Sequence, residues 1–194
     1  MARRTSTFMA FLLGLCLCAI VAESGQKSAK EIKHDTNLQM EPTLTTRKEI
    51  KLIGIAVRTT NQQEMDPATA KIGGLWGRFF QERIADKIPN KALLESTLAA
   101  YTKYESDHTG AYDLIVGREV NSLSSIPVGM TGLTIPAGKY LLFTAKGPMP
   151  RALIDTWAYI WNYFAMHSGH RRSYATDYEL HQPDDNVEIY IAIK

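Results

Sequence analysis

Glu179 is the residue whose type and position in this sequence most favour chemistry. It lies within Ala175–His181, an alternating run that predicts a β-strand, and it is removed from both ends of that run. A carboxylate on a covered sheet face, partly shielded from water, is costly unless a cation pairs with it. Glu179 is therefore a candidate for binding a positively charged ligand on a concave face roofed by helices or loops. The alternative is a solvated outer face, which antiparallel sheets often have.

The C-terminal hairpin predicts the neighbours of this carboxylate. If Pro183–Asn186 forms a four-residue loop, Glu179 lies opposite Tyr190 on one face of the hairpin. In the same register Leu180 lies opposite Ile189, and the second face is continuously apolar. This separation of polar and apolar faces favours the register, and it makes Tyr190 a candidate ligand contact.

Aromatic residues concentrate on two predicted helices. Gly74–Ile84 carries Trp76, and Pro150–His167 carries Trp157 and Trp161 at the spacing of an amphipathic stripe. These rings could simply pack on a sheet, or a subset of them could line a cavity. Rings beside a bound cation would contribute about 0.5–2 kcal/mol each through cation–π attraction.

No catalytic residue is assigned from the sequence, and no cofactor or metal is expected. His167 and His170 span the end of the second predicted helix, where cationic side chains complement the helix dipole.

The elements that must position these residues occur twice in the chain. A strand, a helix and two further strands are predicted within about residues 50–120, and the same order recurs within about 138–194. The predicted elements are Lys51–Thr60, Gly74–Ile84, Leu98–Glu105 and Tyr112–Val120, then Lys139–Ala145, Pro150–His167, Ala175–His181 and Val187–Lys194. The segment Gly129–Gly138 is predicted to connect the two repeats. The fold class is therefore α+β, with an antiparallel sheet, two main helices and a central ligand pocket at the seam between the repeats.

Residues 1–22 have the pattern of a secretory signal peptide. Arg3 and Arg4 precede Phe8–Val21, which contains no charged residue and is short for a membrane span. We expect cleavage and a periplasmic or secreted location, with an uncleaved anchor as the alternative. Residues 23–47 are polar and aperiodic and are predicted to be a flexible tether, followed by one domain over residues 48–194.

Removal of the signal peptide changes the charge and the cysteine content. The whole chain has 22 Lys and Arg against 20 Asp and Glu, and the signal contains two arginines and no acid, so the net charge falls from +2 to 0. No electrostatic case remains for binding nucleic acid. Cys16 and Cys18 also leave, which excludes a disulfide or a thiol nucleophile in the mature chain.

Several segments, in order, resemble the GyrI-like effector-binding fold, also described as SOUL-like. They are IGIAVRTT, IGGLWGRFF, YTKYESDHTGAYDLIVGREV, IPAGKYLLFTAKG, YATDYELH and VEIYIAIK. The most similar subgroup is that of the integron-cassette effector-binding proteins, and the same fold forms the ligand-sensing part of some AraC- and MerR-type transcription regulators.

The resemblance implies a duplicated fold that binds lipophilic, often cationic, small molecules through an acidic residue among aromatics. The acidic position corresponds to Glu179, and Trp76, Tyr101 and Trp157 lie in the matching motifs as expected ring contacts. Some members of the GyrI-like family resemble hydrolases that use a pair of glutamates, and here Glu179 and Glu119 would be the candidates for that pair. Such hydrolysis requires one protonated and one ionised carboxyl group near the same atom. We therefore expect an exported binding module, monomeric or dimeric, for lipophilic cations, with a hydrolase or a protein-binding inhibitor as the alternatives.

Overall fold

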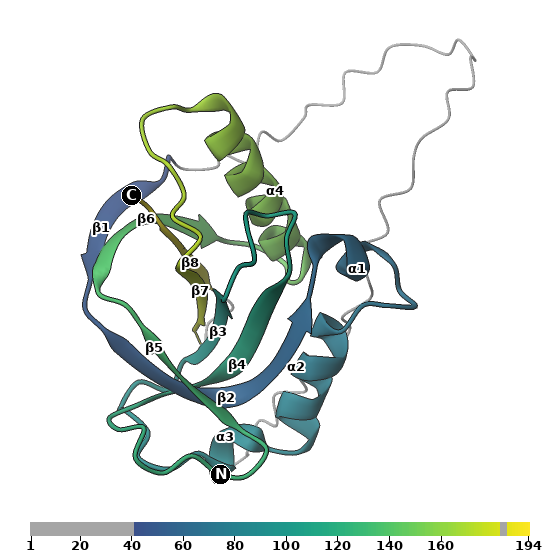
Figure 1. Cartoon of the computed structure of the whole chain (residues 1–194), viewed down its shortest axis with the longest axis vertical. Coiled ribbons are helices and arrows are strands. Elements are labelled where there is room, and N and C mark those ends of the chain that lie inside the picture. The colour runs from purple at the N-terminus through teal and green to yellow at the C-terminus, as the bar shows by residue number, and fades with distance from the viewer. Residues whose placement is uncertain (1–40, 183–185) are drawn as a thin grey trace, which may run out of the picture.

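The computed structural model describes residues 41–182 and 186–194, which form one eight-stranded antiparallel sheet with helices on one side (Figure 1). The strands are β1 (Thr43–Arg47), β2 (Ile50–Thr59), β3 (Thr97–Thr102), β4 (Tyr112–Val120), β5 (Thr131–Ile135), β6 (Gly138–Ala145), β7 (Thr176–His181) and β8 (Val187–Ala192). The helices are α1 (Asn61–Met65), α2 (Ile72–Gln81), α3 (Ile84–Lys87) and α4 (Arg151–Met166). In these described ranges no helix is long and apolar enough to cross a membrane.

The order of the strands confirms the predicted duplication. The sheet runs β1-β6-β8-β7-β3-β4-β2-β5, so that the two repeats meet where β3 pairs with β7. Outward from this seam, β4 and β2 of the first repeat mirror β8 and β6 of the second. The seam places residues that are about 80 positions apart in the chain on adjacent strands.

Each repeat also begins with a strand that pairs with the other repeat. β1 precedes β2 in the chain but pairs with β6, and β5 precedes β6 but pairs with β2. The repeat is therefore strand–strand–helix–strand–strand, with the first strands exchanged. The sequence prediction missed β5, which lies in the segment Gly129–Gly138 that was predicted only to connect the repeats.

The predicted tether ends earlier than expected. Residues 43–47 pair along their whole length with β6, and the Arg47 side chain donates a hydrogen bond to the Tyr178 hydroxyl at 3.0 Å. The ordered domain therefore begins before residue 48. The predicted signal peptide and the rest of the tether, to residue 40, lie outside the described residues.

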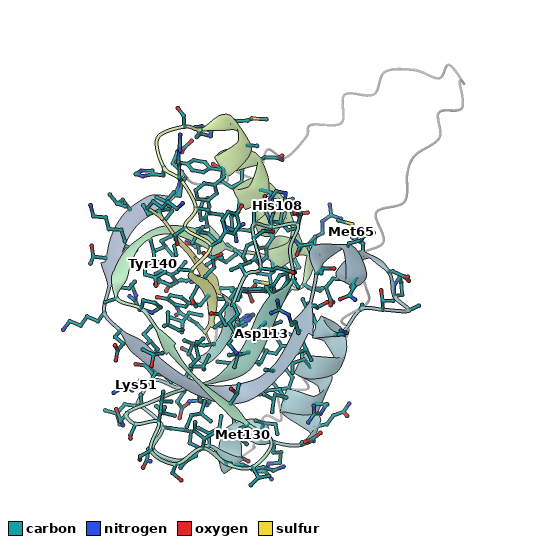
Figure 2. All side chains as sticks on the ribbon, viewed as in Figure 1. Lys51, Met65, His108, Asp113, Met130 and Tyr140 are labelled. Atoms are coloured by element: carbon teal, nitrogen blue, oxygen red, sulfur yellow. The ribbon has the colours of Figure 1, made fainter. Side chains whose placement is uncertain are left out.

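The sheet curls around an apolar interior on the face without helices. One cluster combines residues from strands near opposite ends of the sheet, including Ile135 of β5 and Tyr140 of β6. Tyr140 lies within the space that the curved sheet encloses (Figure 2). The helices consequently pack on the outer side of the curve, not on a concave side as the sequence interpretation assumed.

The two main helices bury the predicted stripes against this outer side. In α2, Leu75, Trp76 and Phe79 are buried in one cluster with β2, β3 and β4. In α4, Ile160 is buried in another cluster with β6 and β8. The helices therefore cover the two halves of the sheet, and the seam of β3 and β7 lies between those halves.

Candidate functional site

Glu179 is buried at this seam on the helix-covered face. It lies in the middle of β7 opposite Ala99 of β3, and only 1% of its surface is exposed. The solvated alternative is therefore wrong. The small side chain of Ala99 leaves room above the sheet, which larger side chains from other elements fill.

Two hydrogen-bond donors contact the same oxygen of this carboxylate. The Tyr101 hydroxyl and the Trp157 indole Nε1 each donate to Glu179 Oε1 at 2.7 Å. Tyr101 comes from β3 and Trp157 from α4, and their rings meet edge to face with centroids 5.2 Å apart. Burial, and then the nearby Glu179 carboxylate, raise the pKa of Tyr101 well above its ordinary value, so that its hydroxyl stays protonated and donates.

The second oxygen is occupied by a histidine. His181 Nε2 lies 2.7 Å from Glu179 Oε2, and the His181 ring meets the Trp76 ring with centroids 4.8 Å apart. Trp76 thus reaches the site through His181. The sequence interpretation did not assign His181 to the site, although residues two apart on a strand share a face and this spacing could have identified it.

Tyr190 lies on the other face of the sheet, contrary to the prediction. The hairpin pairs Glu179 with Ile189 and Tyr178 with Tyr190, one residue away from the predicted register. Tyr190 stacks on Tyr178 with centroids 4.6 Å apart, and its hydroxyl donates to Glu188. Since side chains alternate between faces, a shift of one residue moves the whole strand to the opposite face.

Two further candidates are also separated from Glu179. Trp161 on α4 lies beside Trp157, with centroids 6.4 Å apart, but is 38% exposed and makes no hydrogen bond to the carboxylate. Glu119 lies next to Arg118, which shares the face of Glu179, and so belongs to the opposite face. A hydrolytic pair of Glu119 and Glu179 is therefore excluded by the sheet between them.

A second carboxylate on the same strand and face has a different environment. Asp177 is fully buried and accepts hydrogen bonds from Arg172 at 2.5 Å, from the Tyr104 hydroxyl at 2.9 Å and from the Ala192 backbone N–H at 2.7 Å. Only 6% of the Arg172 side chain is exposed. Asp177 is thus neutralised by a buried guanidinium, whereas the only basic side chain that contacts Glu179 among the described residues is His181.

Exposed rings flank the buried site on both helices. Phe80 of α2 is 53% exposed and stacks on Trp76, and Trp161 of α4 adjoins Trp157. The two helices therefore bring aromatic surface to Glu179 from opposite sides. Tyr101, Trp157 and His181 contact the carboxylate directly and leave it almost fully buried.

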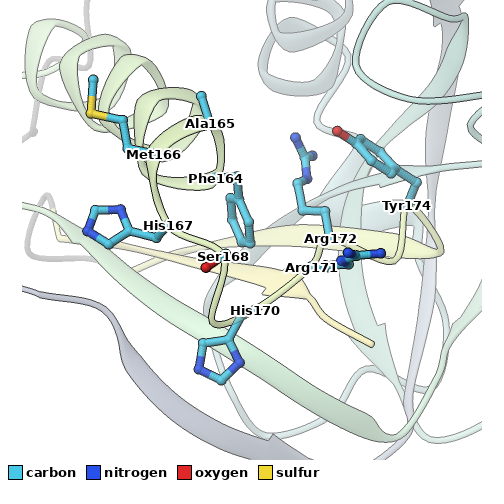
Figure 3. Close-up of a pocket in the computed structure, with 9 residues that line it drawn as sticks. All are labelled: Phe164, Ala165, Met166, His167, Ser168, His170, Arg171, Arg172 and Tyr174. Atoms are coloured by element: carbon cyan, nitrogen blue, oxygen red, sulfur yellow. The ribbon is translucent and has the colours of Figure 1, made fainter.

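A separate hollow lies at the C-terminal end of α4 (Figure 3). It has a volume of about 390 Å³ and is lined by Phe164, Ala165, Met166, His167, Ser168, His170, Arg171, Arg172 and Tyr174. This lining contains two arginines and no acid, so it does not suit a cation. None of the site residues predicted from the sequence lines it.

Comparison with known proteins relates the chain to effector-binding proteins. Residues 43–193 match the family model described as integron-associated effector binding protein. The chain is 38% identical to the integron cassette protein VCH_CASS2 of Vibrio cholerae, whose crystal structure it matches with a TM-score of 0.70 over 80% of this chain and 97% of that one.

Two more distant relatives are similar in structure or in sequence. The structure of SAV2435 bound to tetraphenylphosphonium matches with a TM-score of 0.66 at 23% identity, over 80% of this chain and 94% of that one. The transcriptional regulator BrlR of Pseudomonas aeruginosa is 26% identical over 132 residues, which are 63% of this chain and 46% of that protein. The chain thus matches about half the length of that curated relative.

Proposed function

The chain belongs to the integron-associated effector binding proteins, and from this premise we propose that it binds lipophilic organic cations at Glu179. The observation that carries the proposal is a buried carboxylate whose contacts are two neutral aromatic donors and one histidine. No lysine or arginine of the described ranges forms an ion pair with it.

The aromatic surroundings suit such a ligand better than a small inorganic cation. Ring surface near the carboxylate comes from Tyr101 and Trp157, which contact it, and from Trp76, which contacts His181. An organic cation whose charge is spread over an apolar body would gain from these rings and from apolar burial. The bound ligand of the fold relative SAV2435, tetraphenylphosphonium, has this chemistry.

Binding requires the closed site to open at α4. The Trp157 indole lies over Glu179 Oε1, and the α4 residue beside it, Trp161, is already partly exposed. Outward movement of Trp157 removes one of the two hydrogen bonds to Oε1 and opens the space between the two helices for the apolar body of the ligand. The charge of the ligand then contacts the carboxylate, and a ring stays beside it.

The direct test is substitution of Glu179→Gln, with titration of tetraphenylphosphonium by isothermal calorimetry. The amide oxygen can still accept hydrogen bonds from Tyr101 and Trp157, so the change mainly removes charge. Loss of a charge-assisted contact of about 1.5–3 kcal/mol corresponds to a dissociation constant roughly 10- to 150-fold higher. An unchanged dissociation constant would rule out Glu179 as the cation-binding group.

Glu119→Gln is the matched control, because Glu119 lies on the opposite face of the same sheet. It should bind tetraphenylphosphonium as the unsubstituted protein does. Triphenylphosphine oxide provides an uncharged ligand with similar rings. It should bind more weakly than the cation to the unsubstituted protein, and Glu179→Gln should reduce this preference.

Export of the domain is a further part of the proposal. It is supported by the sequence pattern of residues 1–22, which lie outside the described ranges. Fractionation of bacterial cells that express the full chain should recover the domain from the periplasm or the medium. A version without residues 1–22 should stay in the cytoplasm, and the same distribution for both versions would contradict export.

A further inference from the structure

We propose that His181 acts as an internal occupant of the cation site, so that effector binding displaces its imidazole from Glu179 and is coupled to proton release. The inference rests on the proposed function, because it concerns the same carboxylate. It adds a residue that controls when the site is available.

The geometry places the imidazole where a ligand cation would bind. Glu179 Oε1 already accepts two hydrogen bonds, so Oε2 is the oxygen left for a charged partner, and His181 Nε2 contacts it at 2.7 Å. The ring of Trp76 meets the imidazole at an interplanar angle of 61° with centroids 4.8 Å apart. A carboxylate on one side and an aromatic ring on the other are the contacts expected of a bound organic cation.

His181 is the partner that can leave. Its side chain is 24% exposed, whereas the Glu179 side chain is 2% exposed and lies in mid-sheet. The imidazole can therefore turn toward solvent at little cost in hydration. The carboxylate cannot follow it without breaking the seam of β3 and β7.

Glu179 is the charged group in contact with this imidazole among the described residues. On the neighbouring strands, His181 lies opposite Thr97 of β3 and Val187 of β8, and α2 contributes Trp76. Arg118 lies one strand beyond Thr97, where its guanidinium donates to the Leu94 carbonyl. Tyr101 contacts the other carboxylate oxygen, and burial together with that carboxylate raises its pKa, so its hydroxyl stays protonated.

The protonation state of His181 then sets the cost of displacement. A protonated imidazole forms an ion pair with Glu179, while a neutral one forms only a hydrogen bond, so displacement is harder at low pH. Cation affinity should rise as the pH rises through the range in which histidine loses its proton. By linkage, cation binding within that pH range releases a proton. Because a single titrating group is involved, the dissociation constant of the cation changes by at most tenfold per pH unit.

The experiment measures the dissociation constant of tetraphenylphosphonium at pH 6 and pH 8.5, a range that brackets histidine titration. The charge of this ligand does not change with pH. We expect at least about fivefold tighter binding to the unsubstituted protein at pH 8.5. His181→Gln should bind more tightly than the unsubstituted protein at pH 6 and vary less than about twofold with pH.

His170→Gln is the matched control, because His170 lies beyond the end of α4 in the separate hollow, and it should keep the original pH dependence. Calorimetry of the unsubstituted protein in two buffers of different ionisation enthalpy tests proton release without any variant. A pH-independent affinity, no proton release, or a pH dependence that survives in His181→Gln would overturn the role of His181. Absence of tetraphenylphosphonium binding by every folded variant at both pH values would instead refute the proposed function.

Discussion

Asp177→Asn should destabilise the protein severely although it barely changes the shape of the side chain. The carboxylate is fully buried, and its removal leaves the Arg172 guanidinium, 6% exposed, without its counter-ion. Breaking a buried ion pair on one side costs about 3–5 kcal/mol, because the remaining charge stays buried. For a chain of this size, that loss lowers the melting temperature by on the order of 10 °C.

The assay is equilibrium unfolding in urea, followed by circular dichroism. A double-mutant cycle with Arg172→Met isolates the interaction, because the double variant buries no unpaired charge and should lose much less than the sum of the single changes. A cost below about 1 kcal/mol for Asp177→Asn, or strict additivity in the cycle, would refute the reasoning.

The same assay distinguishes the two carboxylates of β7. Glu179→Gln keeps neutral donors around a neutral amide and leaves no buried guanidinium unpaired. We expect it to cost much less stability than Asp177→Asn while it weakens cation binding. Asp177 would thus act in folding and Glu179 in binding, although they lie two residues apart on one face.

Three further outcomes follow from the fold. In thermal unfolding, Gly54→Ala should strongly destabilise the protein, because the added Cβ would lie 2.2 Å from a backbone oxygen of β4. Gly74→Ala should instead stabilise α2 by about 0.5–1 kcal/mol, because its added Cβ would have no atom within 4 Å. Equal effects of the two substitutions would contradict this. Deletion of residues 1–47 should give a lower melting temperature than deletion of residues 1–40, because only the longer deletion removes β1. Equal melting temperatures for the two deletions would contradict the pairing of β1 with β6. Burial raises the pKa of Tyr140 to about 12, so its contribution to the free energy of unfolding is complete below about pH 10 and is lost as the pH rises to about 12. In urea unfolding, Tyr140→Phe should therefore lose less stability than the unsubstituted protein as the pH is raised over this range. Identical losses of stability would contradict this.

Much of the fold could be predicted because local patterns encode it. Alternation of apolar and polar residues identified six strands, and the spacing of apolar and aromatic residues identified α2 and α4. β1 and β5 escaped prediction because they are short edge strands in polar or glycine-containing segments. Their exchange between the repeats depends on pairing over about 80–100 residues, which no local pattern records.

The chain alone determined that an acid lies in mid-strand among aromatic helices, because composition and periodicity are local properties. Tertiary structure decided which of those aromatics reach it: Tyr101 and Trp157 contact Glu179, Tyr190 lies on the reverse face, and His181 takes the remaining oxygen. The physical reason is the two-residue period of a strand, since one step of register exchanges the faces. The backbone N–H of Gln182 donates to the carbonyl of Asn186, so the strands pair one residue away from the predicted alignment and Tyr190 lies opposite Tyr178.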